Sequence, residues 1–134
     1  MASKFHIYSA ISSINQALTK NSKCTSIVYT PFTLELVKVL YLNGFLNSFV
    51  KKQYFTNNLL LLYFRHSLIS RIKTIKPFSR PGHRRYISFK KLEHLLIQKS
   101  IHVTYYLNTS RGILSGSEAL HYRIGGELLF TLNF

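Results

Sequence analysis

The segment from residue 115 to residue 132 limits the possible folds of this chain more than any other. It starts with Ser115-Gly116-Ser117-Glu118, which has the Ser-x-x-Glu spacing of a capping box at the start of a helix. Gly125-Gly126 ends that helix after a few residues, and the run 127–132 is typical of a strand. A short helix followed directly by a strand favours an α+β fold.

The N-terminal half contains the same mixture of helix and strand signals. Apolar residues recur at helical spacing over about residues 5–19, and residues 24–29 suit a short strand. Thr30-Pro31 supplies an N-cap and a first-turn proline for a second helix, which Gly44 ends. Two β-prone runs on either side of Thr56-Asn57-Asn58 then indicate a hairpin. These elements predict a lobe with the order α-β-α-β-β.

The boundary between two lobes is expected near Ile75, at the end of a segment, residues 69–75, that could form a further strand. Beyond it, Ser88 can cap a helix and residues 102–107 are β-prone. A length of 134 residues suits one compact unit or two small lobes. We expect an N-terminal α/β lobe over 1–75 and a C-terminal lobe over 76–134, which is mostly β with short helices.

The charge of the chain is strongly unbalanced. It has 18 Lys and Arg residues against four acidic residues, and the net charge of +14 attracts polyanions. Eight basic residues lie within 21 positions with no acid among them: Arg71, Lys73, Lys76, Arg80, Arg84, Arg85, Lys90 and Lys91. Phe78, Tyr86 and Phe89 lie between them. Basic residues with interleaved aromatic residues are typical of nucleic-acid-binding surfaces.

Other functional classes have little support. Cys24 is the only cysteine, the six histidines lack metal-site spacing, and the four carboxylates form no evident pair. The glycines at 112 and 116 lack the lysine of a P-loop, and the longest apolar run, 59–64, is far shorter than a spanning helix of ~20 residues. We therefore expect that the protein is not an enzyme, that it holds no metal or cofactor, and that neither a small-molecule substrate nor a membrane is its partner. Peripheral membrane binding by the basic face is a less favoured alternative.

Short hydroxyl side chains and glycines gather near the C-terminus. The hydroxyl groups come from Thr109, Ser110 and Ser115, and the glycines are Gly112, Gly125 and Gly126. Hydroxyl and bare backbone groups suit the shallow minor groove of RNA, whereas phosphate contacts of Lys and Arg give affinity without selectivity. We expect this segment to select the partner. Ser115 can also be a helix cap, and both roles can hold together, whereas a tight turn is the alternative role of Gly125-Gly126.

Three motifs in the C-terminal half keep the order and spacing of one known family. They are Ser79-Arg80-Pro81-Gly82-His83-Arg84-Arg85-Tyr86, then Thr109-Ser110-Arg111-Gly112 with Ser115 through Glu118-Ala119, and finally Gly125-Gly126-Glu127. They resemble the Ser-Lys/Arg-Pro-Gly-x-Arg-x-Tyr, the Ser-Thr-Ser-Lys-Gly-Val-Met-Thr-Asp-x-Glu-Ala and the Gly-Gly-Glu motifs of the universal small-subunit ribosomal protein eight family. The resemblance is strong over residues 75–134 and weak over 47–70.

The resemblance implies a primary binder of the central domain of small-subunit rRNA, which acts early in subunit assembly beside neighbouring small-subunit ribosomal proteins. It implies a two-lobed fold whose C-terminal lobe, residues 76–134, grips the rRNA. Together with the basic cluster it gives the expected RNA-binding set: Arg71, Lys73, Lys76, Ser79, Arg80, Pro81, Gly82, Arg84, Arg85, Tyr86, Asn108, Thr109, Ser110, Arg111, Gly112, Ser115, Gly125, Gly126 and Glu127.

The chain departs from the family pattern at several positions. Asn108 replaces the first Ser of Ser-Thr-Ser, Gly116 replaces the Asp, and Arg111 replaces the Lys while keeping its charge. Asn15 stands where the family has an Arg after the first helix's Ile, which puts an N-terminal backbone contact in doubt.

The amino-acid usage bears on the compartment and the alternatives. Residues with AT-rich codons are abundant, which indicates an AT-rich genome and favours a mitochondrial, matrix location on the ribosome over a plastid or a bacterial cytoplasm. A free-standing RNA-binding or ribosome-assembly factor of similar fold is the alternative to a ribosomal protein.

Overall fold

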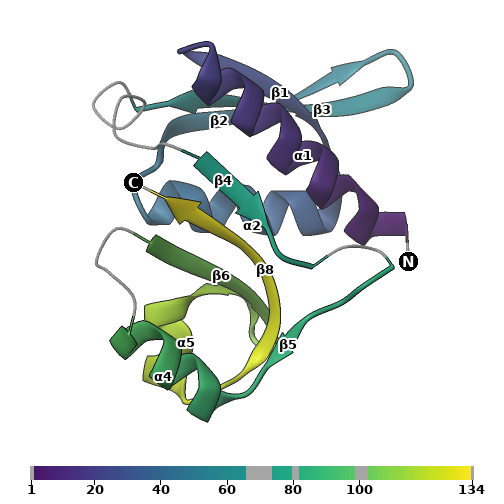
Figure 1. Cartoon of the computed structure of the whole chain (residues 1–134). Coiled ribbons are helices and arrows are strands. Elements are labelled where there is room, and N and C mark those ends of the chain that lie inside the picture. The colour runs from purple at the N-terminus through teal and green to yellow at the C-terminus, as the bar shows by residue number, and fades with distance from the viewer. Residues whose placement is uncertain (1, 66–73, 80–81, 99–102, 134) are drawn as a thin grey trace. The chain divides into compact units, whose positions relative to one another are not determined.

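The chain forms two compact units, residues 1–73 and residues 74–134 (Figure 1). The computed structural model describes residues 2–65, 74–79, 82–98 and 103–133. The division lies two positions before the boundary expected after residue 75, because the strand that starts at Thr74 pairs within the second unit. The segment 69–75, which could form a further strand or lead out to the second lobe, falls largely outside the described residues.

The first unit packs two helices against a three-stranded sheet. Its elements are α1 (Ala2–Thr19), β1 (Cys24–Val28), α2 (Pro31–Leu42), β2 (Leu46–Tyr54) and β3 (Asn57–Phe64). The sheet is antiparallel in the order β1-β3-β2. The predicted order α-β-α-β-β is confirmed. Buried apolar side chains from both helices and from the sheet form the core: Ile7, Ile11, Ile14, Leu18, Leu36, Val37, Leu40, Ile27, Leu60 and Leu62.

Local signals set the ends of α2. The Thr30 hydroxyl accepts a bond of 3.1 Å from the Thr33 N–H, and the Thr33 hydroxyl accepts one of 2.8 Å from the Thr30 N–H. Pro31 starts the helix, and Gly44 follows its end with φ +84°, a conformation that glycine adopts at little cost. The predicted cap and stop are therefore confirmed. In contrast, the β2–β3 turn is formed by Phe55 and Thr56, earlier than predicted, because Asn57 already pairs with Tyr54.

The second unit is mostly β with two short helices. Its elements are β4 (Thr74–Pro77), β5 (Tyr86–Ile87), α4 (Phe89–Gln98), β6 (Val103–Thr109), β7 (Gly112–Ser115), α5 (Gly116–Tyr122) and β8 (Gly126–Asn133). The sheet has the order β4-β8-β6-β7, and β5 also pairs with β8. The predicted α+β class is confirmed, but β5 and β7 were not predicted.

The core of the second unit lies between its sheet and its helices. Leu92 from α4 and Ala119 from α5 pack with Tyr105, Leu107 and Leu128 from the two central strands. Figure 1 shows α4 and α5 next to each other on the side of β6. This packing leaves the β6–β7 turn, the end of α5 and most of the described segment before β5 at the surface. The β6–β7 turn and the segment before β5 carry several of the expected binding residues.

Candidate nucleic-acid interface

The β6–β7 turn presents one free hydroxyl. Thr109 pairs with Gly112, so Ser110 and Arg111 alone form the turn, and Gly112 has φ +95°. The Thr109 hydroxyl donates to the Gly112 carbonyl at 2.9 Å and accepts from the Arg111 N–H at 3.1 Å. Thr109 thus stabilises the turn from within. Ser110 is exposed, and its hydroxyl has no partner in the described part of the chain.

Arg111 stacks on an aromatic side chain that the sequence analysis did not select. Its guanidinium carbon lies 4.5 Å from the centre of the Tyr122 ring, at the end of α5. Both side chains are exposed. A cation over a ring face at this distance is attracted to it, so the guanidinium is oriented before any ligand arrives. Only the aromatic character of Tyr122 hinted at this role, because its contact with Arg111 depends on the fold.

Ser115 is a helix cap. Its hydroxyl accepts a bond of 3.4 Å from the Glu118 N–H, and its own N–H donates to the Glu118 carboxylate at 3.0 Å. Ser115 is buried and its role as a cap is confirmed, while its expected contact with RNA stays a prediction. Asn108 directly precedes Thr109 in β6. It is half-buried and pairs with Ile113 in β7 and with Glu127 in β8.

Gly125 and Gly126 allow close packing inside the unit. A Cβ on Gly125 would lie 2.4 Å from the Ile87 carbonyl oxygen, and one on Gly126 would lie 2.4 Å from the Asn108 carbonyl oxygen. We expected these glycines to offer bare backbone to a partner. The space beside them is instead filled by backbone atoms of the same unit. Their absence of a side chain lets β5 and β6 approach β8.

Glu127 is buried and bound to Arg84. The carboxylate is 2% exposed and accepts a bond of 2.9 Å from Arg84 Nη1, whose side chain is 27% exposed. Burying a carboxylate is costly unless it is paired and hydrogen-bonded. Glu127 and Arg84 thus each have an internal partner, and the expected RNA contacts of both residues stay predictions.

Ser79 is also an internal residue. It is fully buried, its hydroxyl donates to the Leu128 carbonyl at 2.7 Å, and it accepts from the Arg85 N–H at 3.1 Å. These two bonds join the two ends of the segment between β4 and β5 to each other and to β8. Ser79 therefore holds the two ends of the loop, and its expected contact with RNA stays a prediction.

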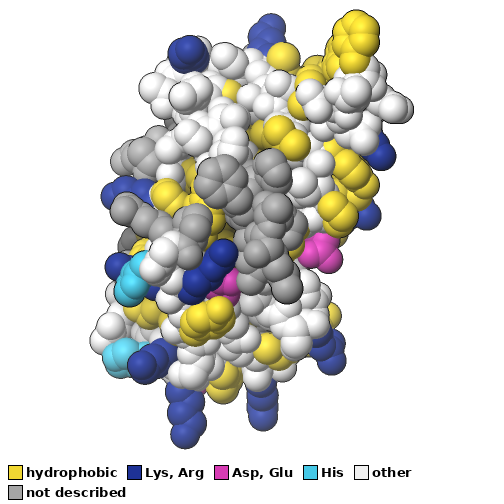
Figure 2. Space-filling model, turned by 90° about the vertical axis from the view of Figure 1, so that its right-hand side faces the viewer, with side chains coloured by type: hydrophobic (Ala, Val, Ile, Leu, Met, Phe, Trp, Pro, Cys, Tyr) yellow, Lys and Arg dark blue, Asp and Glu magenta, His cyan; other side chains and the backbone are white. Residues whose placement is uncertain are grey.

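The remaining expected residues divide into exposed ones and ones outside the description. Among the expected residues, Lys76, Arg85, Tyr86, Arg111 and Gly82 are exposed, as are Lys90 and Lys91 of the basic cluster. Outside the described residues lie Arg71, Lys73, Arg80 and Pro81. Figure 2 shows Lys and Arg side chains projecting from the molecule, with few acidic side chains between them. This surface suits a polyanion.

Comparison with known proteins decides the family. The family model described as Ribosomal protein S8 matches residues 6–132, nearly the whole chain. The chain belongs to the ribosomal protein S8 family. Members of the S8 family are structural proteins without enzymatic activity, which confirms the expectation that this chain is not an enzyme.

Relatives within the S8 family come from two organelles. Small ribosomal subunit protein uS8c of Marchantia polymorpha is 32% identical over 92% of this chain and 93% of its own length. Small ribosomal subunit protein uS8m of Acanthamoeba castellanii is 32% identical over 88% of this chain and 84% of its own length. For uS8c of Panax ginseng the identity is 34%, over 89% of this chain and 90% of that protein.

Metal clusters and membrane-spanning helices are both absent from the described residues. They contain no group of three or more His, Cys, Asp or Glu side chains that could hold a metal ion. Within the same residues, no helix has both the length and the apolar character needed to cross a bilayer.

Proposed function

We propose that this protein is a structural constituent of a small ribosomal subunit that binds the central domain of small-subunit rRNA and supports its assembly. Membership of the S8 family supports a ribosomal role. The observation that carries rRNA binding is that two groups stand side by side in the sequence of the β6–β7 turn. One is the exposed Ser110 hydroxyl, and the other is the Arg111 guanidinium, which stacks on Tyr122.

The two kinds of group have different tasks. Exposed cations such as Lys76, Arg85 and Arg111 neutralise phosphates and release condensed counterions, which gives affinity for any structured RNA. The Ser110 hydroxyl can donate to or accept from a base edge or a 2′-hydroxyl, and such contacts distinguish one RNA site from another. Residues with internal bonds, among them Ser79, Ser115 and Glu127, support the part of the fold that presents these groups.

A titration with two RNAs tests this function. The purified chain should bind a central-domain fragment of small-subunit rRNA more tightly than a scrambled RNA of equal length. Affinity for both should fall steeply as the salt concentration rises, because several phosphates are neutralised. A flat salt response, or equal affinity for the two RNAs, would contradict the proposal. Sedimentation with the small subunit at high salt separates a ribosomal constituent from a free-standing assembly factor.

We further propose a mitochondrial location. The abundance of residues with AT-rich codons supports it, and one relative, uS8m of Acanthamoeba castellanii, is a mitochondrial protein. The plastid is the competing compartment, because relatives named uS8c are more numerous. Immunodetection in purified organelle ribosomes distinguishes the two.

A further inference from the structure

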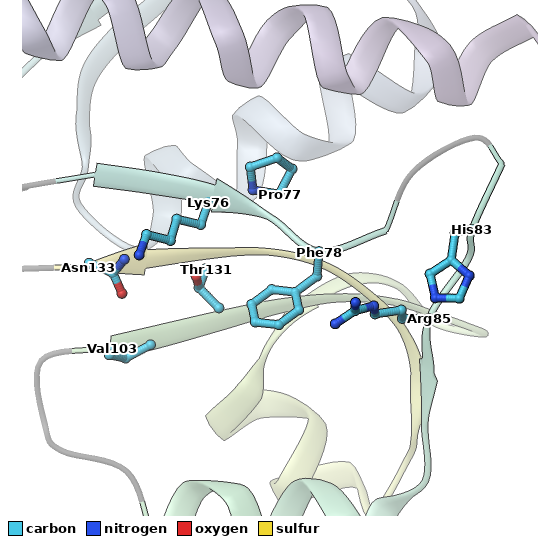
Figure 3. A pocket seen from close by; sticks show the side chains of 8 residues that line it. All are labelled: Lys76, Pro77, Phe78, His83, Arg85, Val103, Thr131 and Asn133. Carbon is cyan, nitrogen blue, oxygen red and sulfur yellow. The ribbon is translucent and has the colours of Figure 1, made fainter.

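A groove of about 680 Å³ opens on the second unit beside β4 and β8 (Figure 3). An aromatic side chain, Phe78, lies in the middle of its lining, with Lys76 and Asn133 toward one end and Arg85 and His83 toward the other. Its described lining contains no carboxylate. A volume of this size is enough for one nucleotide, since pockets of roughly 300–1,000 Å³ hold small organic ligands.

Backbone pairing with β8 builds the groove. The Phe78 N–H donates to the Leu129 carbonyl at 2.9 Å, and the Leu128 N–H donates to the Arg85 carbonyl at 2.9 Å. Residues 78 and 85 therefore occupy neighbouring places along one edge of β8, and the buried Ser79 hydroxyl ties the two places together. The guanidinium carbon of Arg85 consequently lies 5.9 Å from the centre of the Phe78 ring.

The chemistry of the lining suits a nucleotide. Phe78 is half-buried and rests on Tyr105, with ring centres 6.4 Å apart, so the ring has a firm support. Lys76 and Arg85 are exposed on either side of it. At 5.9 Å Arg85 is near the outer limit of a cation–π contact, so little energy opposes its movement toward a phosphate. An aromatic platform between cations is how proteins hold single-stranded nucleic acid.

We propose that this groove binds one unpaired nucleotide of an RNA strand, with its base stacked on Phe78 and its flanking phosphates on Lys76 and Arg85. The proposal rests on the proposed function and makes it more specific, because the bound RNA then has an unpaired nucleotide at this groove. A paired base is stacked on both sides within its helix and cannot reach the ring, whereas a bulged base can turn outward.

A single tryptophan provides a direct test. The natural chain has no Trp, so Phe78→Trp introduces the only one. Its fluorescence should be quenched by an RNA duplex with one bulged adenosine and much less by the same duplex fully paired. Phe55→Trp is the matched control, because Phe55 is fully exposed in the first unit and should respond equally to both RNAs. Equal quenching of the Phe78→Trp protein by both RNAs would overturn the proposal.

Affinities provide the second test. Phe78→Leu keeps an apolar side chain against Tyr105 but has no ring, and should reduce the preference for the bulged RNA roughly tenfold while binding to the paired duplex is unchanged. An unchanged preference for the bulged RNA would overturn the assignment of the groove alone. If the natural chain bound neither RNA, the proposed function itself would be overturned. Should Phe78→Leu lower the melting temperature, the Phe78→Trp protein decides, since it retains an aromatic ring.

The source of the nucleotide needs its own comparison. AMP at millimolar concentration should leave the Phe78→Trp fluorescence nearly unchanged, because a free nucleotide lacks the second phosphate contact. Quenching by AMP as strong as that by the bulged RNA would assign the groove to free nucleotides and overturn the RNA assignment.

Discussion

Arg84 and Glu127 form an ion pair of 2.9 Å across 43 positions of the chain, with the carboxylate 2% exposed. The pair joins the segment before β5 to the start of β8. Of the described arginines in the Ser79–Tyr86 motif, Arg84 is the one whose side chain lies against an acid, so part of its hydrogen-bonding capacity is used within the chain. Its main contribution is therefore to the stability of the second unit.

Arg84→Ala should lower the free energy of unfolding of the second unit by about 3 kcal/mol, because it leaves Glu127 buried without its cation. Arg85→Ala, one position away and exposed, should change it by less than about 0.5 kcal/mol while weakening RNA binding. Hydrogen exchange of the β8 amides and melting temperature measure the difference. Adding Glu127→Gln should recover part of the loss, and equal melting temperatures for the two alanine variants would contradict this role.

Gly126→Ala should destabilise the sheet by roughly 2–3 kcal/mol, because the added Cβ would lie 2.4 Å from the Asn108 carbonyl oxygen and the strands would have to separate. Gly82→Ala is the matched control, since no atom lies within 4 Å of the position its Cβ would take. Urea unfolding followed by circular dichroism compares them. A Gly126→Ala protein as stable as the control would show that β6 and β8 can shift freely.

Features within about four residues of each other were predictable from the sequence, and pairings between distant segments were not. Thr30-Pro31 and Ser115 to Glu118 act as predicted because their caps involve only neighbouring residues. Gly125 was misread because the atom that excludes a side chain, the Ile87 carbonyl oxygen, lies far away in the sequence. The two residues of β5 are too few for any periodic pattern and are a strand only through β8.

The candidate surface divides along the same line. The exposed cations and Ser110 could be predicted as candidate RNA-binding residues from charge and residue type alone. The family could be recognised from the three motifs. The internal roles of Ser79 and Glu127 could not be predicted, because the partner of each residue is distant in the sequence. Ser79 bonds to Leu128 in β8, and Glu127 in β8 bonds to Arg84 before β5. Tyr122 was missed for the same reason, since its contact with Arg111 requires α5 to fold back beside the β6–β7 turn.

Tyr122→Leu should reduce affinity for the cognate rRNA about threefold, because a cation–π contact of about 0.5–1 kcal/mol no longer orients Arg111. The charge is retained, so the salt dependence should stay the same. Arg111→Gln should instead lower the slope of log affinity against log salt by about one. Tyr54→Leu, at an exposed position of the first unit, is the control. A Tyr122→Leu protein with natural affinity would mean that Arg111 needs no orienting partner.

Ser110→Ala should lower affinity for the cognate rRNA roughly fivefold, because one hydrogen bond of about 1 kcal/mol is lost and an RNA group is left unpaired. Affinity for a scrambled RNA and the melting temperature should not change, since the hydroxyl is exposed and bonds to nothing in the described part of the chain. Filter binding with both RNAs and a thermal melt provide the measurements.

Thr109→Val is the informative comparison for Ser110→Ala, because the Thr109 hydroxyl bonds within the turn, to Gly112 and Arg111. It should lower the melting temperature and weaken binding to both RNAs, since the turn that presents Ser110 and Arg111 loses its internal support. A Ser110→Ala protein that behaves like Thr109→Val, with a lower melting temperature and equal losses on both RNAs, would give Ser110 a structural role. A loss on the cognate RNA alone would place the selection of the rRNA site at this one hydroxyl.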